Sequence, residues 1–310
     1  MSRAARSITK HRFARNKRYV LFVIVAIAAL GFSAYRFLPG SETFSSTAGS
    51  QKQTESNKAN STEVLSKNDA GLQQLIETWR KKYSFDASVV VIELSGDMRT
   101  ASYNATSSIV PGSTYKLYVA YAILHDVEQG KLDLHTMLTD GKTVQTDLQR
   151  MIVNSDNAAA RTLGFYYGWK NINALLQSVD ITHTDLYNYI PPSTEPQGNK
   201  YSTVSDLATL LQKLANGTLL NADNSELLIS MMKQQQYRQR IPAGVPSGVI
   251  VADKPGWLSP ADGYDGRIEN DAAIVYGTKS TYILVIATTG STTAPLTNLS
   301  SQVYDYLQQS

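Results

Sequence analysis

Three short motifs supply side chains that could form an ester on a serine. Ser113-Thr-Tyr-Lys116 places a hydroxyl and an amine three residues apart, on one face of a helix. Ser155-Asp-Asn157 adds a second hydroxyl and an amide, and Lys254-Pro-Gly256 adds a cation next to a glycine. A serine is a weak nucleophile until a base removes its proton, and a lysine kept neutral by burial can be that base. The motifs together therefore predict acyl transfer through a serine ester.

The order of the motifs is more specific than any one of them. Ser-x-x-Lys occurs three times, starting at Ser7, Ser113 and Ser230, so a single match means little. Lys-x-Gly occurs once, at Lys254, and only the serine motifs at Ser113 and Ser155 precede it within suitable secondary structure. The prediction therefore depends on the combination.

Ser113 lies at the predicted start of an apolar helix that runs from residue 115 to about residue 127. Unpaired backbone N–H groups and the helix dipole favour negative charge at such a position, so the Ser113 N–H is a candidate oxyanion donor. The alternative is that Ser113 only caps the helix. Lys116 begins a mostly apolar run, where an idle lysine would be costly, and this favours the catalytic interpretation.

Ser155 and Asn157 lie in a predicted turn between two helical segments. The Ser155 hydroxyl is a candidate proton relay, and the Asn157 amide is a candidate donor to a substrate carbonyl. The alternative is that Asp156 or Asn157 caps the second helix, and different residues of the triplet can do both.

Lys254 is predicted to end an apolar strand, where its charge would attract a carboxylate and help to keep Lys116 neutral. Gly256 permits close backbone approach, so the N–H of Trp257 is a candidate second oxyanion donor. The alternative is an ordinary strand end followed by a Pro-Gly turn.

Hydrophobic periodicity predicts an α+β fold for residues 71–310, with strands at both ends and helices between them. The expected strands are 88–94, 100–103, 248–254, 271–276 and 281–288, and the expected helices are 72–79, 115–127, 144–153, 157–167, 171–179, 204–215, 224–233 and 296–307. This order predicts one antiparallel sheet built from both ends of the domain, flanked by the terminal helices, with a helical subdomain beside it. The motifs then fall where the sheet meets the helical subdomain, which is a favourable place for a cleft.

The motifs, their spacing and their flanks resemble those of the class A β-lactamases and related penicillin-binding serine peptidases over about residues 71–310. The run 252–257, Ala-Asp-Lys-Pro-Gly-Trp, also fits, as do the paired final strands through Ala287-Thr-Thr-Gly and the terminal helix. The resemblance implies a substrate that is a β-lactam or a peptidoglycan peptide. It also implies a role for each motif residue: Ser113 as the nucleophile, Lys116 as its proton acceptor, Ser155 and Asn157 as bridge and substrate clamp, and Lys254 as the carboxylate-binding cation.

Two departures from that family bear on binding and turnover. Pro255 stands where the family usually has Thr or Ser, so a hydroxyl that would contact a substrate carboxylate is absent. The family's deacylating glutamate lies in a Glu-x-x-Leu-Asn pattern, whereas this chain offers only Asp185 and Glu195, both of which fit better as ordinary loop acids. Three hypotheses therefore stay open: a hydrolase, a D-Ala-D-Ala-type peptidase with a long-lived acyl-enzyme, and a cell-wall-binding module with a weakened site.

The first seventy residues predict a membrane tether. Residues 1–18 carry seven Lys or Arg and no acid, and residues 19–35 carry no charge. We expect a single-pass anchor within 19–38, a basic leader in the cytoplasm, a solvated linker over 39–70 and an extracellular domain over 71–310. The alternative is a secreted protein, cleaved near Phe32-Ser33-Ala34.

Composition argues against several other functions. Residues 1–38 hold eight of the 29 basic residues and none of the 26 acids, so the rest of the chain has a net charge of −5 and no nucleic-acid partner is predicted. The chain has no cysteine, which excludes disulfides and thiolate metal sites. It also lacks metalloprotease, nucleotide-binding and Gly-x-Ser-x-Gly motifs, so neither metal nor cofactor is predicted.

Overall fold

The computed structural model describes residues 67–186, 200–262 and 266–309 of the 310-residue chain. The predicted leader (1–18), the predicted anchor or signal (19–38) and most of the predicted linker (39–70) lie outside the described residues. No helix within the described ranges has both the length and the apolar character that crossing a membrane requires. The first described strand begins at Lys67, so the fold takes in the last residues of the predicted linker.

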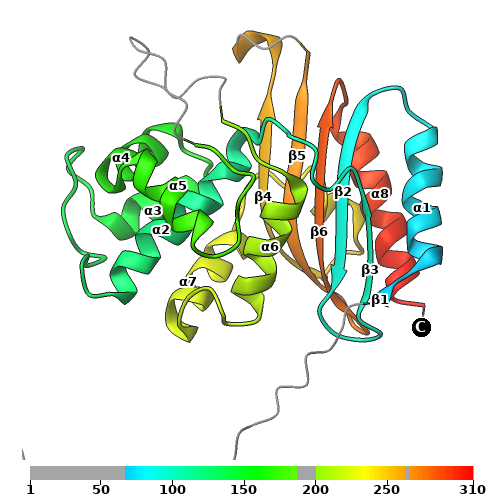
Figure 1. Ribbon diagram of the computed structural model, residues 1–310, viewed down its shortest axis with the longest axis horizontal. Helices are drawn as coiled ribbons and strands as arrows, with labels where there is room; N and C mark the ends of the chain where they lie inside the picture. The colour runs from blue at the N-terminus through cyan, green and yellow to red at the C-terminus, as the bar shows by residue number, and fades with distance from the viewer. Residues whose placement is uncertain (1–66, 187–199, 263–265, 310) are drawn as a thin grey trace, which may run out of the picture. The chain divides into compact units, whose positions relative to one another are not determined.

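The described strands form one six-stranded sheet in the order β1-β3-β2-β6-β5-β4 (Figure 1). The strands are β1 (Lys67–Asn68), β2 (Asp86–Glu93), β3 (Arg99–Tyr103), β4 (Ile250–Leu258), β5 (Ile268–Tyr276) and β6 (Thr281–Thr289). All neighbours pair antiparallel except β1 and β3, which run parallel. β2 pairs along its whole length with β6, which confirms that the two ends of the domain build a common sheet.

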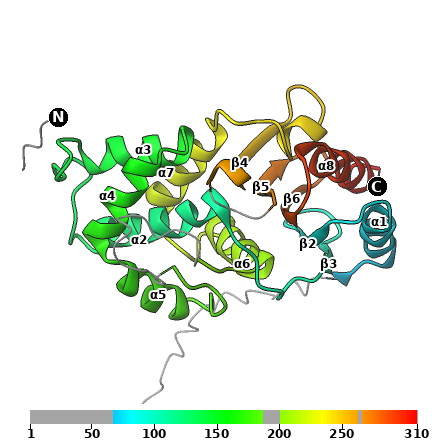
Figure 2. The same cartoon turned by 90° about the horizontal axis from the view of Figure 1, so that it is seen from above.

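The helices divide into a terminal pair and a central block, as Figure 2 shows from above. The α-helices are α1 (Ala70–Lys81), α2 (Lys116–Glu128), α3 (Val144–Val153), α4 (Asn157–Tyr167), α5 (Trp169–Gln177), α6 (Val204–Ala215), α7 (Ala222–Lys233) and α8 (Thr293–Leu307). Three short 3₁₀ turns complete the described elements: η1 (Gly112–Tyr115), η2 (Pro242–Gly244) and η3 (Pro260–Asp262). α1 packs against α8, while α6 packs against β2, β5 and β6 and joins the helical block to the sheet.

The sheet separates two hydrophobic cores. On β6, Ile283 and Val285 face the helical block, while Leu284 and Ile286 face α1 and α8. Each of these side chains is fully or almost fully buried, because both faces of the sheet are covered. This explains why the late strands read as nearly continuous apolar runs instead of alternating apolar and polar residues.

The largest correction to the predicted elements concerns β4. The strand continues to Leu258, so Lys254 lies in its middle, and the prediction of a strand end followed by a Pro-Gly turn is wrong. Pro255 is compatible with a strand here because β4 is at the edge of the sheet. The residues before and after Lys254 pair with β5, and this pairing holds Lys254 in place.

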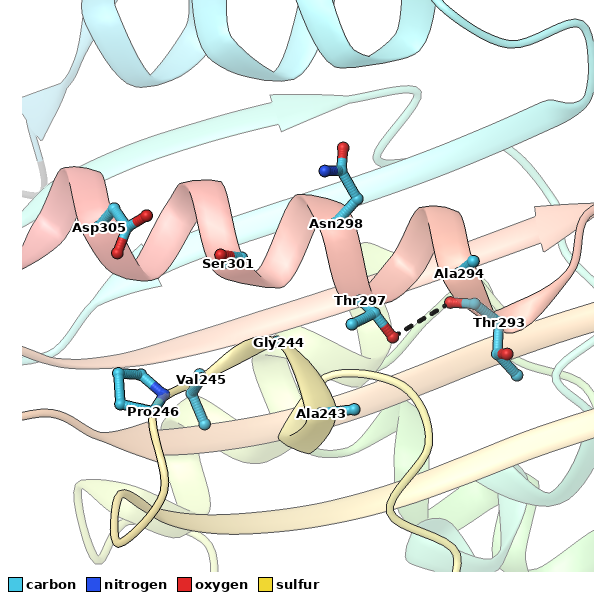
Figure 3. A pocket seen from close by; sticks show the side chains of 10 residues that line it. All are labelled: Ala243, Gly244, Val245, Pro246, Thr293, Ala294, Thr297, Asn298, Ser301 and Asp305. Atoms are coloured by element: carbon cyan, nitrogen blue, oxygen red, sulfur yellow. Dashed lines mark hydrogen bonds between the residues drawn. The ribbon is translucent and has the colours of Figure 1, made fainter.

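A surface hollow lies between η2 and α8 (Figure 3). Its lining residues are Ala243, Gly244, Val245, Pro246, Thr293, Ala294, Thr297, Asn298, Ser301 and Asp305. It belongs to the α8 side of the sheet, whereas Lys116 and Lys254 belong to the side of the helical block.

Trp79→Ala is expected to lower the free energy of unfolding by about 3 to 5 kcal/mol, because a large core side chain is lost. Trp79 on α1 is buried, and its Nε1 donates to the carbonyl of Pro295 on α8 at 3.0 Å. Urea unfolding followed by circular dichroism measures the change. Phe165→Ala, at a side chain that is 53% exposed, is the control and should change stability little. If both variants lowered the free energy of unfolding equally, the assignment of Trp79 to the hydrophobic core on the α1 and α8 side of the sheet would be wrong.

Candidate active site

The structure brings the three motifs together around two buried amines. Lys116 Nζ donates to the Ser155 carbonyl at 2.6 Å and to Asn157 Oδ1 at 2.7 Å, and it lies 3.3 Å from Ser155 Oγ. Lys254 Nζ donates to the same Ser155 Oγ at 2.9 Å and to the Pro255 carbonyl at 2.9 Å. The hydroxyl of Ser155 therefore bridges the lysines of the first and third motifs.

Ser113 lies in η1, the 3₁₀ turn that leads directly into α2. Both elements lie wholly within the described residues, and neither has a side-chain cap, so the alternative that Ser113 only caps the helix is not supported. The Thr114 hydroxyl instead closes the turn by donating to the Pro111 carbonyl at 2.7 Å. Lys116 is the first residue of α2, so Ser113 and Lys116 lie close together along the chain where the helix begins.

The edge strand β4 packs directly on this turn. A Cβ atom added to Gly256 would lie 2.7 Å from the Ser113 nitrogen and 2.5 Å from the Pro111 oxygen. A Cβ atom added to Gly112 would lie 2.9 Å from the Trp257 nitrogen. Only glycine permits such an approach. The backbone amides of Ser113 and Trp257, predicted as the two oxyanion donors, are therefore brought next to each other.

The second motif combines a helix cap with contacts to the buried amine. Asp156 caps α4 by accepting from the backbone N–H groups of Ala158 at 2.8 Å and Ala159 at 3.0 Å. Its other oxygen accepts from Arg150 Nη2 at 2.6 Å. Ser155 takes a left-handed backbone conformation, with φ at 55°, which costs energy for a residue with a side chain. The cap fixes the turn, and the turn aims the side chains of Ser155 and Asn157 at Lys116.

Burial lowers the pKa values of both amines below the usual value for lysine. Burial first, and then the charge of Lys254, lower the pKa of Lys116 to about 6. Burial likewise lowers the pKa of Lys254 to about 7, opposed by the charges of Asp253 and Asp271. An amine with a pKa near 6 is mostly neutral at pH 7 and can accept a proton. Lys116 therefore has the protonation state that a general base requires.

A buried ionic network lies behind Lys254 on the other face of β4. Asp253 Oδ1 accepts from Arg238 Nη1 at 2.6 Å, and Asp271 Oδ2 accepts from the Ile241 N–H at 3.0 Å. Burial raises the pKa of Asp271 to about 6 and, with the charge of Asp271, raises the pKa of Asp253. No local sequence pattern signals this network, because its members come from three separate segments.

Of the two candidate deacylating acids, the structure describes only Asp185. Asp185 is exposed; its Oδ1 accepts from Asn173 Nδ2 at 2.6 Å, and its backbone pairs with Tyr201. Glu195 lies outside the described residues. Sequence reasoning missed a different residue of this region, Lys200, whose Nζ lies 4.1 Å from the ring centroid of Tyr115. Among the described residues, no group of three or more His, Asp or Glu side chains is arranged to hold a metal ion.

Sequence comparison finds β-lactamases among the relatives of this chain. The chain is 29% identical over 221 residues to a β-lactamase of Bacillus amyloliquefaciens, which covers 63% of this chain and 69% of that protein. It is 26% identical over 215 residues to β-lactamase SME-1 of Serratia marcescens, covering 61% of this chain and 72% of the relative.

Solved structures share the fold. One is a point mutant of PBP-A, solved as an acyl-enzyme complex with penicillin G. It superposes on this chain with a TM-score of 0.69 at 19% identity, covering 79% of this chain and 99% of that one. An ancestral class A β-lactamase gives 0.67 at 21% identity, covering 76% and 99%. The sequence model of the β-lactamase enzyme family matches residues 70–307. The chain therefore belongs to the β-lactamase enzyme family and, as a member of it, is a hydrolase.

Proposed function

We propose that this chain is an extracytoplasmic serine hydrolase that opens β-lactam amide bonds through an ester on Ser113. The observation that carries the proposal is the buried Lys116 amine, directly after the Ser113 turn, in contact with Ser155 and Asn157. A buried amine whose pKa is lowered by burial and by a neighbouring charge, next to a serine turn, is a candidate general base. The similarity to the β-lactamases of Bacillus amyloliquefaciens and Serratia marcescens supports the substrate class.

In the first half-reaction Lys116 Nζ takes the proton of Ser113 while Oγ attacks the lactam carbonyl carbon. The carbonyl oxygen becomes an oxyanion between the N–H groups of Ser113 and Trp257. The C–N bond then breaks, and the lactam nitrogen takes a proton from the Ser155 hydroxyl. Ser155 is replenished from Lys116, whose proton came from Ser113, so the charges balance at the ester. A water molecule then attacks the ester carbonyl carbon, the C–Oγ bond breaks, one proton of the water passes to Ser113 Oγ, and the opened product leaves as a carboxylic acid.

Substrate binding is assigned to Asn157 and Lys254. Asn157 uses Oδ1 to accept from Lys116, so its NH₂ group is the donor for a substrate carbonyl. Lys254 offers its charge to a substrate carboxylate. Pro255 removes the neighbouring hydroxyl, so the carboxylate is held by fewer groups than in relatives with Thr or Ser there. We expect weaker binding of the carboxylate for this reason.

The location is part of the proposal and depends on the sequence of residues 1–38. The basic leader and the uncharged run 19–35 support a single-pass anchor, with the domain outside the cell membrane. A flexible linker over 39–70 would let the domain reach substrates near the cell wall. Secretion after cleavage is the alternative location.

A second candidate function is a penicillin-binding D-Ala-D-Ala-type peptidase whose acyl-enzyme is long-lived. Two observations favour it: Asp185 is bound to Asn173, and the buried lysine Lys200 lies beside the acylation machinery. Both candidates share the first half-reaction and differ in the second. The lifetime of the ester therefore separates them.

Brief exposure of the full-length chain to benzylpenicillin is expected to raise its intact mass by one penicillin, and Ser113→Ala should abolish the increase. Ser107→Ala, at an exposed serine, is the matched control and should be acylated normally. Decay of the added mass during a chase without drug favours the hydrolase, and persistence favours the peptidase. If Ser113→Ala gained the same mass as the wild type, the proposed nucleophile would be wrong.

The pH profile of kcat/KM for acylation is expected to be bell-shaped. Lys116 must be neutral, so the rate rises as pH increases through about 6, and Lys254 must be charged to bind a carboxylate, so the rate falls above about 7. Stopped-flow measurement with a fluorescent penicillin tests this. Lys254→Arg, which stays charged, should remove the alkaline limb and leave the acid limb in place. A profile without limbs between about pH 5 and 8 would exclude these assignments.

Gly256→Ala is expected to slow acylation by about 100-fold or more while the chain stays folded. The added Cβ would lie 2.5 Å from the Pro111 oxygen and 2.7 Å from the Ser113 nitrogen, and so would force apart the two proposed oxyanion donors. The acylation rate and a thermal unfolding curve are measured together. Ile250→Ala, at a side chain that is 55% exposed at the other end of β4, is the control and should leave the rate unchanged. Unchanged acylation in Gly256→Ala would argue against this oxyanion hole.

A further inference from the structure

Lys200 is a buried lysine beside the candidate active site, and the proposed reaction does not use it. Only 7% of the residue is exposed. Its Nζ lies 4.1 Å from the ring centroid of Tyr115 and 5.1 Å from that of Trp169. The ring faces attract a cation and offset part of the cost of removing it from water. The two rings therefore form a seat for the Lys200 ammonium.

Backbone pairing after Lys200 and packing of the Trp169 ring hold this arrangement in place. After Lys200, the backbone of Tyr201 pairs with Asp185 through two hydrogen bonds of 2.9 Å, and Ser202 pairs with Ile109. The Trp169 ring packs so closely on α4 that a Cβ atom added to Gly164 would clash with it. The direction of the Lys200 side chain is thus fixed by its backbone and by the rings it contacts.

The ring of Tyr115 lies near both Lys200 and the proposed base, Lys116. It directly precedes Lys116, whose Nζ lies 6.0 Å from the centroid of the same ring. Since Lys200 Nζ lies 4.1 Å from that centroid, the two amines are at most about 10 Å apart. Two unit charges at this separation inside a protein repel each other appreciably. A charged Lys200 therefore opposes protonation of Lys116.

The charged groups that act on Lys116 within the described part of the chain come from three separate segments. Lys254 on β4 and Lys200 disfavour its charge, while Asp156 at the start of α4 favours it. The carboxylate of Asp156 is itself paired with Arg150, at 2.6 Å. The ring between the two lysines adds no charge of its own, because burial raises the pKa of the Tyr115 phenol and keeps it neutral, although the charge of Arg161 opposes this shift. Lys200 is thus the second cation, after Lys254, that acts on the base.

We propose that Lys200 is a positioning residue of the acylation reaction: its ammonium, seated on Tyr115 and Trp169, keeps Lys116 in the neutral form that accepts the proton of Ser113. This inference rests on the proposed function, because it assigns Lys200 an effect on the base of that reaction. In this proposal Lys200 acts on the reaction through the effect of its charge on Lys116.

The order of protonation supports this assignment. Burial lowers the pKa of Lys200 to about 7, whereas the pKa of Lys116 is lowered to about 6. As pH falls, Lys200 therefore takes up its proton first, and Lys116 must then be protonated against an existing charge. Removing the charge of Lys200 should let Lys116 take its proton at higher pH.

The test is the titration of Lys116 in the full-length chain, followed by NMR of ¹³Cε-labelled lysine, with the signal assigned from Lys116→Arg. In Lys200→Gln the midpoint of Lys116 is expected to rise by about half to one pH unit, as a charge at about 10 Å predicts. Lys200→Arg keeps the charge and should leave the midpoint at or below that of the wild type. Lys170→Gln removes a charge from an exposed neighbour on α5 and should have no effect.

The acid limb of the acylation profile is measured on the same variants. It should move by the same amount as the Lys116 titration in Lys200→Gln and stay in place in Lys170→Gln. An unmoved midpoint in Lys200→Gln, or an equal shift in Lys170→Gln, overturns the inference. If Lys116 titrates as expected but no variant, including the wild type, is acylated, the proposed function fails and the electrostatic link between the two lysines stands.

Discussion

The structure depends on one constraint: two lysine amines are buried on either side of a single serine hydroxyl. Lys116 Nζ and Lys254 Nζ both lie within hydrogen-bond distance of Ser155 Oγ, and both residues are fully buried. Two ammonium ions cannot be kept this close without water at acceptable cost, so at least one amine must release its proton. The proton leaves Lys116, because burial and the charge of Lys254 both act against it. The proposed base is therefore produced by packing.

The fold holds this costly arrangement by fixing its three parts from separate places. β4 is paired with β5 along its length and packs on the Ser113 turn through Gly256. α4 begins at the cap that Asp156 provides, which sets the direction of Ser155 and Asn157. α2 packs against α3, α4, α5 and α7, so Lys116 begins a helix that is held by four neighbours. Strain at Ser155 persists because these contacts outweigh it.

Much of the fold and of the site could be predicted from local patterns. The bounds of α3, α4 and α6 followed from apolar periodicity, and the sheet built from both ends followed from the positions of the strands. Lys254 was misplaced at a strand end because Pro255-Gly256 reads locally as a turn. The pairing with β5 overrides that tendency, and an edge strand tolerates the proline. Lys200 could not have been singled out, because the rings on which its proposed role depends lie far away along the chain.

The same charges that favour the first half-reaction act against the second. Lys254 and Lys200 lower the pKa of Lys116, and by the same repulsion of positive charge they lower the pKa of any carboxylic acid close to them. A carboxylate with a lowered pKa is a weaker base toward the water that must attack the ester. In the proposed reaction, the charges of Lys254 and Lys200 therefore favour acylation, while a carboxylate that assists deacylation loses basicity. If the proposed reaction is correct, the three buried lysines favour formation of the acyl-enzyme more than its hydrolysis.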